Sequence, residues 1–225
     1  MSRRPRIGRL VFSTVLFAGL AVVWFERQSI YDWWRLRSYD APAAIVQLAT
    51  DTTMNDTARR VFYVSHPEID DKTNFRTHCV NDEREQTIVL GCYISNKGIH
   101  ILAVDDARLA GVEQVTAAHE LLHAAYERLD KGERDKIDKL LNQAYATVAD
   151  ARIRATVQAY ETAGADVVNE LHSILGTEVK NLPTELELHY RRYFSDRSKI
   201  VTYSEAYQHA FTERKDKVAV YDAEL

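Results

Sequence analysis

The pattern of apolar and polar positions changes character along the chain. Residues 10–25 form an uncharged and almost wholly apolar run, with four arginines among the nine residues before it. Short β-rich runs follow at 61–64, 87–94 and 99–104, and a Ser-Asn-Lys-Gly segment typical of a hairpin turn separates the last two. From residue 112 onward apolar residues recur every three or four positions, which predicts helices.

These patterns predict an α+β fold, with a small antiparallel β-sheet followed by a mostly helical domain. A short helix is also expected near 43–48, before the first strand. The helices after the sheet are expected near 112–128, 131–148, 150–162, 165–175, 184–194 and 204–215. The chain then divides into a basic head at 1–9, an apolar segment at 10–25, a spacer at 26–58 and one folded domain at 59–225.

The apolar segment at 10–25 is predicted to be a transmembrane anchor. Its 16 residues span about 24 Å as a helix, slightly short of the usual ~20 residues. Trp24, Trp33 and Trp34 lie at or just beyond its end, as in an interfacial aromatic belt. The alternative is a signal peptide cleaved near 19–21, but the apolar run continues past that point. The arginine-rich head favours a cytoplasmic N-terminus and an extracytoplasmic body.

Length and charge narrow the class of protein. The chain has 225 residues and a net charge of −4, which suits one domain with additions. The first 37 residues carry +5 and the remainder −9, so the body is acidic. An acidic body gives no reason to expect nucleic acid as a partner.

Two cysteines fit an exported body. An even pair in an oxidising compartment favours a disulfide between Cys79 and Cys92, and two free thiols are the alternative. In the chain-entropy model a loop of that length stabilises the fold by about 3 kcal/mol. A zinc ribbon would need four ligands at short spacing, which this pair lacks.

The segment at 115–126 contains the pattern H-E-x-x-H. Residues four apart lie on one face of a helix, so His119 and His123 can direct two imidazoles at one metal ion. Glu120 is about 100° around the helix from His119, where its carboxylate can act as a general base on water. Composition alone predicts roughly 0.02 such matches per chain. The other residues of 116–125 are uncharged, unlike those of a surface helix, so a catalytic zinc site is expected.

This segment resembles the zincin metallopeptidases, in which a strand precedes the metal helix and forms the upper rim of the cleft. Residues 99–104 are similar to that strand, and the resemblance implies that a peptide substrate pairs with it through main-chain hydrogen bonds. The metzincin subgroup would require Gly and His where this chain has Tyr126 and Leu129.

The gluzincin subgroup fits better, because it supplies a third ligand from a second helix within N-E-x-x-S. Residues 169–173 match that pattern, so the resemblance implies Glu170 as the third zinc ligand. The family often has Asp after the Ser, where this chain has Ile174, so the carboxylate that orients a ligand histidine is open between Glu178 and Asp166. Glu161, Asp166 and Glu178 remain competitors for the third ligand position.

Similar enzymes stabilise the oxyanion of the tetrahedral intermediate with a Tyr or a His. The candidates for this role are His189, Tyr190 and Tyr193. The sequence thus predicts a membrane-anchored, extracytoplasmic zinc metallopeptidase with one Zn²⁺ per chain and a peptide or protein substrate. The alternatives are a hydrolase that cuts peptide links in cell-wall material and a non-enzymatic helical module at the cell surface.

Overall fold

The computed structural model describes residues 7–79 and 90–223, without the side chains of 7–11, 13, 21–25 and 211–223 in its helices. The chain divides into two compact units, Met1–Asp40 and Ala41–Leu225. The second unit begins well before residue 59, where the sequence led us to place the start of the domain. Its first residues belong to the body because Ile45, Leu48 and Ala49 are buried in the core.

The first unit consists of one long helix, α1 (Ile7–Leu36), which includes the whole segment predicted as an anchor. Several positions of that segment (10, 11, 13 and 21–25) lie outside the described side chains. Within the part of the chain that is described, no helix is long and apolar enough to cross a membrane.

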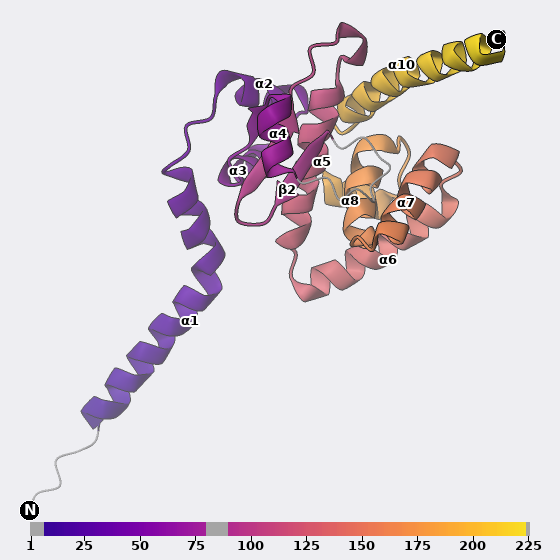
Figure 1. Ribbon diagram of the computed structural model, residues 1–225. Coiled ribbons are helices and arrows are strands. Elements are labelled where there is room, and N and C mark those ends of the chain that lie inside the picture. The colour runs from indigo at the N-terminus through magenta and orange to yellow at the C-terminus, as the bar shows by residue number, and fades with distance from the viewer. Residues whose placement is uncertain (1–6, 80–89, 224–225) are drawn as a thin grey trace, which may run out of the picture. The chain divides into compact units, whose positions relative to one another are not determined.

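The second unit is α+β, as predicted (Figure 1). Its long helices from residue 112 onward agree with the predicted ranges, except that α9 is shorter and α10 longer. The helices of this unit that the structure describes are α2 (Ala43–Asp51), α3 (Asp56–Val64), α4 (Lys72–His78), η1 (Ala107–Leu109), α5 (Val112–Glu127), α6 (Lys131–Thr147), α7 (Ala151–Ala163), α8 (Val167–Glu178), α9 (Thr184–Tyr190) and α10 (Ser198–Ala223).

The sheet has the strand order β1-β3-β2 and is mixed rather than antiparallel. β2 (Gly91–Ile94) and β3 (Gly98–Leu102) form the predicted hairpin, whose turn is made by Ser95, Asn96 and Lys97. Residues 87–89 of the predicted strand lie outside the described residues. β1 (Glu68–Asp70) pairs in parallel with β3 and was not predicted, because three residues are too few to show an alternating pattern.

The prediction of a strand at 61–64 is wrong, because these residues form the end of helix α3. The side chain of Asn55 accepts a hydrogen bond from the backbone N–H of Ala58 and caps the start of this helix. Ala58, Val61 and Phe62 then share one face and are buried. A four-residue apolar run does not by itself distinguish a buried strand from a helical face.

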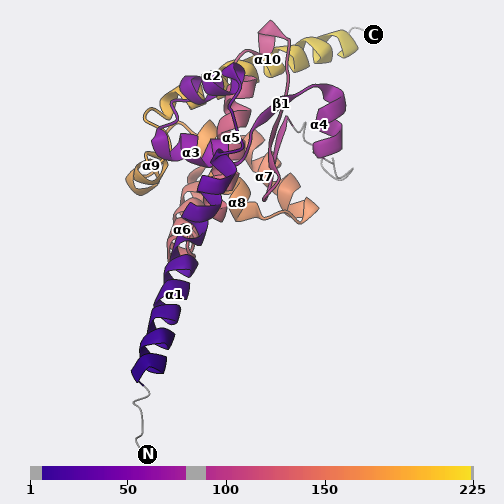
Figure 2. The ribbon, with the colours of Figure 1, turned by 90° about the vertical axis from the view of Figure 1, so that its left-hand side faces the viewer.

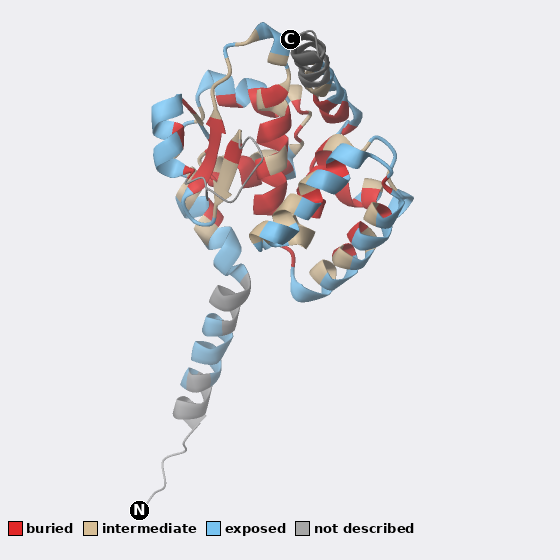
Figure 3. Ribbon diagram, turned by 45° about the vertical axis from the view of Figure 1, so that its right-hand side comes forward, coloured by how far each residue is buried: buried red, intermediate tan, exposed pale blue. Residues whose placement is uncertain are grey.

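Helix α5 lies at the centre of the body and carries the H-E-x-x-H segment. It packs against α8, α10, α3, α2 and two strands of the sheet. Figure 3 shows it as an almost continuously buried helix between the sheet and the later helices. Charged residues are therefore excluded from most of its surface, and those that remain must have partners or a function.

Candidate metal centre

Two imidazoles of α5 face the same space between this helix and α8. His119 and His123 lie one helical turn apart, with ring centroids 4.8 Å apart and ring planes at 71°. Neither ring is fully buried, because both line a cleft. The spacing alone places them on one face, and the packing of the rest of the body places that face at the cleft.

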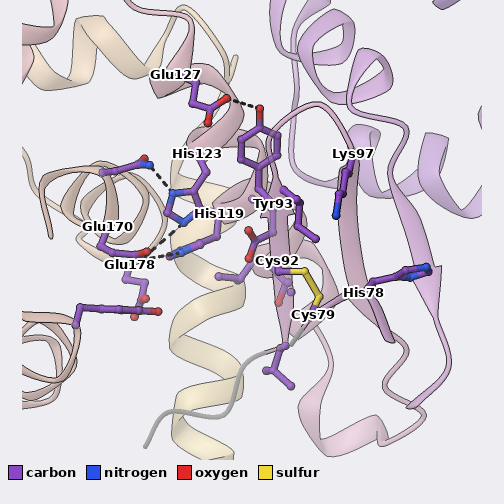
Figure 4. Close-up of a pocket in the computed structure, with 18 of the residues that line it drawn as sticks. His78, Cys79, Cys92, Tyr93, Lys97, His119, His123, Glu127, Glu170 and Glu178 are labelled. Carbon is purple, nitrogen blue, oxygen red and sulfur yellow. Dashed lines mark hydrogen bonds and ion pairs between the residues drawn. A yellow bond between two sulfur atoms is a disulfide. The ribbon is translucent and has the colours of Figure 1, made fainter. Parts of the chain in front are cut away.

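The carboxylate of Glu170 joins this pair from α8. Its Oε2 atom lies 3.8 Å from Nε2 of His119 and 3.7 Å from Nε2 of His123, and Figure 4 shows all three side chains converging. The competitors have other roles: Glu161 is exposed on α7, Asp166 caps α8, and Glu178 lines the cleft but forms an ion pair of 2.7 Å with Arg152. The structure thus brings together the three predicted ligands.

The close approach of α8 to α5 depends on Gly176. A Cβ atom at this position would lie 2.5 Å from Cδ1 of Leu122 on α5 and 2.8 Å from Cε1 of Tyr190. Both distances are far below a normal carbon contact of about 3.5–4.0 Å. The absence of a side chain at Gly176 therefore allows the helix that carries Glu170 to lie against the helix that carries the histidines.

The protonation state of Glu170 suits a metal ligand. Burial raises the pKa of this carboxyl, but the neighbouring imidazoles of His119 and His123 and a hydrogen bond from Tyr160 lower it by more. The result is a pKa below the ordinary value, so the group is a carboxylate near neutral pH. Its Oε2 is buried and has no hydrogen-bond partner among the described residues.

Asn169 orients one of the imidazoles. Nδ1 of His123 lies 3.0 Å from Oδ1 of Asn169, so the Nδ1–H group donates a hydrogen bond to the amide oxygen. Nε2 of His123 is then unprotonated, and its lone pair faces His119 and Glu170. This is the tautomer of histidine that binds a metal through Nε2. This role had been expected of Glu178 or Asp166.

Both of those carboxylates have other partners. Asp166 caps α8 by accepting a hydrogen bond from the backbone N–H of Asn169, and Glu178 pairs with Arg152 and Gln208. An amide, and neither of these two carboxylates, is thus the partner of His123 among the described residues. Asn169 was within reach of sequence reasoning, since it is the first residue of the N-E-x-x-S match.

A zinc ion fits the three donors. Bonds of about 2.0–2.1 Å in tetrahedral geometry place neighbouring ligand atoms about 3.3 Å apart. The observed separations of 3.7 and 3.8 Å need only a few tenths of an ångström of contraction. Two nitrogens and one carboxylate oxygen are a donor set of catalytic zinc sites, and the unpartnered Oε2 of Glu170 lacks only a cation.

Glu120 lies where α5 meets the edge strand β2. A Cβ atom on Gly91 would be 2.8 Å from Oε1 of Glu120 and 2.4 Å from Cγ2 of Thr116. Glycine at this point lets the strand lie close over the helix and leaves room for the Glu120 carboxylate. This carboxylate is buried but lines the same cleft as the two histidines.

The cleft has a volume of about 680 Å³ and is walled on one side by β2. β2 is the edge strand, whereas β3, at 98–102, pairs with a strand on each side. The expectation that a peptide pairs with residues 99–104 is therefore wrong, since that strand has no free edge. β2 is the strand of the described sheet that borders the cleft and has one side unpaired.

The residues suggested for oxyanion stabilisation do not line the cleft. The hydroxyl of Tyr190 is buried and donates a hydrogen bond of 2.8 Å to the carbonyl oxygen of His172. Nε2 of His189 lies 2.8 Å from Nε2 of His172, and burial lowers the pKa of His189 to about 4. Tyr193 is buried as well. All three belong to the packing beneath the metal helix.

Three of the described tyrosines line the cleft, namely Tyr93 of β2, Tyr160 of α7 and Tyr207 of α10. The hydroxyl of Tyr93 donates a hydrogen bond of 2.7 Å to Glu127. Tyr160 forms a hydrogen bond with Glu170, and burial raises the pKa of Tyr207, so its hydroxyl keeps its proton near neutral pH. No sequence motif distinguished Tyr160 and Tyr207, because they come from helices that only tertiary packing brings to the site.

Comparisons with protein-family models, curated proteins and solved structures found no match for this chain.

Proposed function

We propose that the protein is a zinc-dependent metallopeptidase of the zincin type. The single observation that carries the proposal is the convergence of His119, His123 and Glu170, from two helices, in a cleft that Glu120 also lines. A purely structural site would not need the adjacent carboxylate. When bound, zinc would polarise the scissile carbonyl and lower the pKa of a water molecule to about 7.

Glu120 is the general base in this mechanism. Its carboxylate takes a proton from the attacking water and delivers it to the nitrogen of the leaving amine. It can reach that water because it lies one residue from His119 and faces the same cleft. Asn169 holds His123 in the tautomer that leaves Nε2 unprotonated, and despite burial the neighbouring imidazoles and Tyr160 together lower the pKa of Glu170.

The edge strand β2 orients the substrate. An extended peptide that adds to the side of Gly91–Ile94 without a partner among the described strands would run along the cleft above α5, held by main-chain hydrogen bonds. The close contact of Gly91 with Glu120 places a carbonyl bound there near the general base. Tyr207 is the cleft hydroxyl that we assign to the oxyanion, because it lines the cleft and burial raises its pKa, so that it keeps its proton near neutral pH.

The cellular location is part of the same proposal. We assign residues 10–25 to a membrane anchor and the body to the extracytoplasmic side. The arginine-rich head supports this orientation, and the Cys79–Cys92 disulfide supports an oxidising compartment.

The test of the proposed function is the variant Glu120→Gln, which keeps the size of the side chain and removes its basicity. The cleft should still hold about one zinc ion per chain, while the turnover of a peptide library falls about 10²- to 10⁴-fold. His119→Gln should abolish both zinc binding at the cleft and activity. The library should include cell-wall peptides, so that the two classes of substrate are separated.

Tyr190→Phe is a matched control, because this tyrosine is buried outside the cleft. It should leave turnover within a few-fold of the wild type, whereas Tyr207→Phe should lower kcat by about 10²–10³. Undiminished turnover in Glu120→Gln would refute the mechanism, and a zinc-loaded wild type that cleaves no member of the library would refute the function.

A further inference from the structure

A second cluster of metal-ligating side chains lies on the other face of the sheet. Side chains alternate along a strand, so Glu68 and Asp70 of β1 point to one face. Glu68 is the register partner of His100 on β3, which places His100 beside both carboxylates. Gly91 contacts α5 from the opposite face, so Asp70 and His100 lie across the sheet from α5, whereas His78 also lines the cleft.

His78 completes the cluster from α4. This helix covers the sheet face that carries Asp70 and His100, and Figure 2 shows it beside β1. Nδ1 of His78 lies 3.0 Å from Oδ2 of Asp70, and Nδ1 of His100 lies 2.9 Å from the same oxygen. One ligand atom from each of the four residues, Glu68 included, lies within 4.8 Å of the other three.

The separations of 2.9 and 3.0 Å from Asp70 to the two imidazoles are close to those of ligands around one small cation, and the other ligand atoms lie within 4.8 Å and would have to move inward. Ligand atoms with bonds of about 2.0–2.1 Å to zinc are about 3.3 Å apart in a tetrahedral site. Asp70 and His100 are buried, and His78 and Glu68 are exposed. The cluster therefore has a rigid floor and one open side through which an ion can enter.

Charge balance favours a cation over a set of hydrogen bonds alone. With both histidines neutral the cluster carries two negative charges, and the described residues place no lysine or arginine in an ion pair with Glu68 or Asp70. The two imidazole rings stack with centroids 4.0 Å apart and both approach the same carboxylate oxygen. A divalent cation would offset the charge of both carboxylates.

The disulfide preorganises this arrangement. Cys79 follows His78 directly, and Cys92 is the register partner of His100 on the neighbouring strand. The bond between them ties the end of α4 to β2 and so holds His78 over His100. Figure 4 shows His78 beyond the disulfide, on the side away from His119. Ligands held on strands and by a covalent tether lose little freedom when they bind.

We propose that Glu68, Asp70, His78 and His100 bind a second divalent cation, and that its chemical class is that of Zn²⁺. Two imidazoles and two carboxylates suit zinc better than the hard cations, which prefer oxygen alone. Four protein ligands would fill all four coordination positions of a tetrahedral zinc ion, as in structural zinc sites. The bound ion would join β1, β3 and α4 behind the strand that walls the cleft.

The test is the zinc stoichiometry of the full chain. The protein is stripped with a chelator, dialysed against micromolar free Zn²⁺ and analysed for metal by mass spectrometry. The wild type should hold two zinc ions per chain. His78→Gln and Asp70→Asn should each hold one, because each removes a ligand of the sheet cluster. His209→Gln, which changes an exposed histidine outside both clusters, should still hold two.

Two further outcomes separate this proposal from the proposed function. Loss of the cleft ion in His119→Gln should leave one zinc, which the double variant with His78→Gln should lose. A wild type with one zinc that only His78→Gln removes would support the sheet site and refute the cleft site. A wild type with one zinc that survives in both His78→Gln and Asp70→Asn would overturn the sheet site. His78 is exposed, so its replacement should leave folding intact, as circular dichroism would check.

Discussion

Replacement of Gly176 by alanine should separate the two helices that form the metal centre. The added Cβ would lie 2.5 Å from Cδ1 of Leu122, about 1 Å closer than carbon atoms normally approach. Leu122 and Tyr190 are fully buried, so neither has free space to move into. The strain must then be relieved by moving α8, and with it Glu170, away from α5.

The magnitude follows from the packing and from the ligand distances. Overpacking of a core costs about 1–3 kcal/mol, which we expect as a loss in the free energy of unfolding of the metal-free protein. Glu170 Oε2 is already 3.7–3.8 Å from both Nε2 atoms, so a retreat of about 1 Å would carry it beyond reach of a shared ion. A loss of about 1–3 kcal/mol in the free energy of zinc binding corresponds to roughly 5- to 150-fold weaker zinc affinity.

The assay combines urea unfolding in the presence of a chelator with zinc competition against a chromophoric chelator. Gly132→Ala is the matched control, because this glycine is exposed on α6 and its nearest neighbouring atom would be 3.4 Å from the new Cβ. That variant should gain up to about 1 kcal/mol of stability and bind zinc normally. Wild-type stability and zinc affinity in Gly176→Ala would refute the idea that this contact sets the distance between the helices.

Three further predictions concern stability and location. Burial lowers the pKa of His189 to about 4, below its ordinary 6.5, so the unfolded chain binds more protons between these values. His189 should therefore contribute about 3 kcal/mol to the loss of stability of the metal-free protein as pH falls from 6.5 to 4, and urea unfolding should show a smaller loss in His189→Gln. Reduction of Cys79–Cys92 should cost about 3 kcal/mol, measured by urea unfolding with and without reductant. Protease added to intact cells should digest the body.

Each of these has a result that contradicts it. Equal acid sensitivity in wild type and His189→Gln would assign the effect to other groups. Unchanged stability after reduction would mean that the disulfide does not restrict the unfolded chain. Protection of the body in intact cells, lost on lysis, would reverse the proposed orientation.

The parts of the site that were predicted from sequence are those governed by local geometry. The placement of His119 and His123 on one face follows from the hydrogen-bond ladder of a helix, which repeats every 3.6 residues whatever surrounds it. The long helices after residue 112 show the same period over several turns, and the hairpin at 91–102 is marked by its turn. The pairing of Cys79 with Cys92 needed no geometry, since the chain has only two cysteines.

Short elements could not be assigned in this way. The apolar run at 61–64 is compatible with the period of a strand and with that of a helix. The cap formed by Asn55 and the burial of one face favour the helix. β1 has three residues, and its parallel pairing with β3 arises from the packing of α4 and the sheet. The sheet was expected to be antiparallel because the visible strands formed a hairpin.

Contacts between distant elements were decided only by the tertiary structure. The N-E-x-x-S pattern suggested Glu170 as a ligand. Its short distance to the histidines depends on the close packing of α8 against α5, which the absence of a side chain at Gly176 allows. The partner of His123 proved to be an amide rather than a carboxylate, and Tyr160 and Tyr207 reached the cleft in place of the residues expected there. Periodicity shows which face of an element is buried, but the shapes of the packed side chains decide how closely two elements approach.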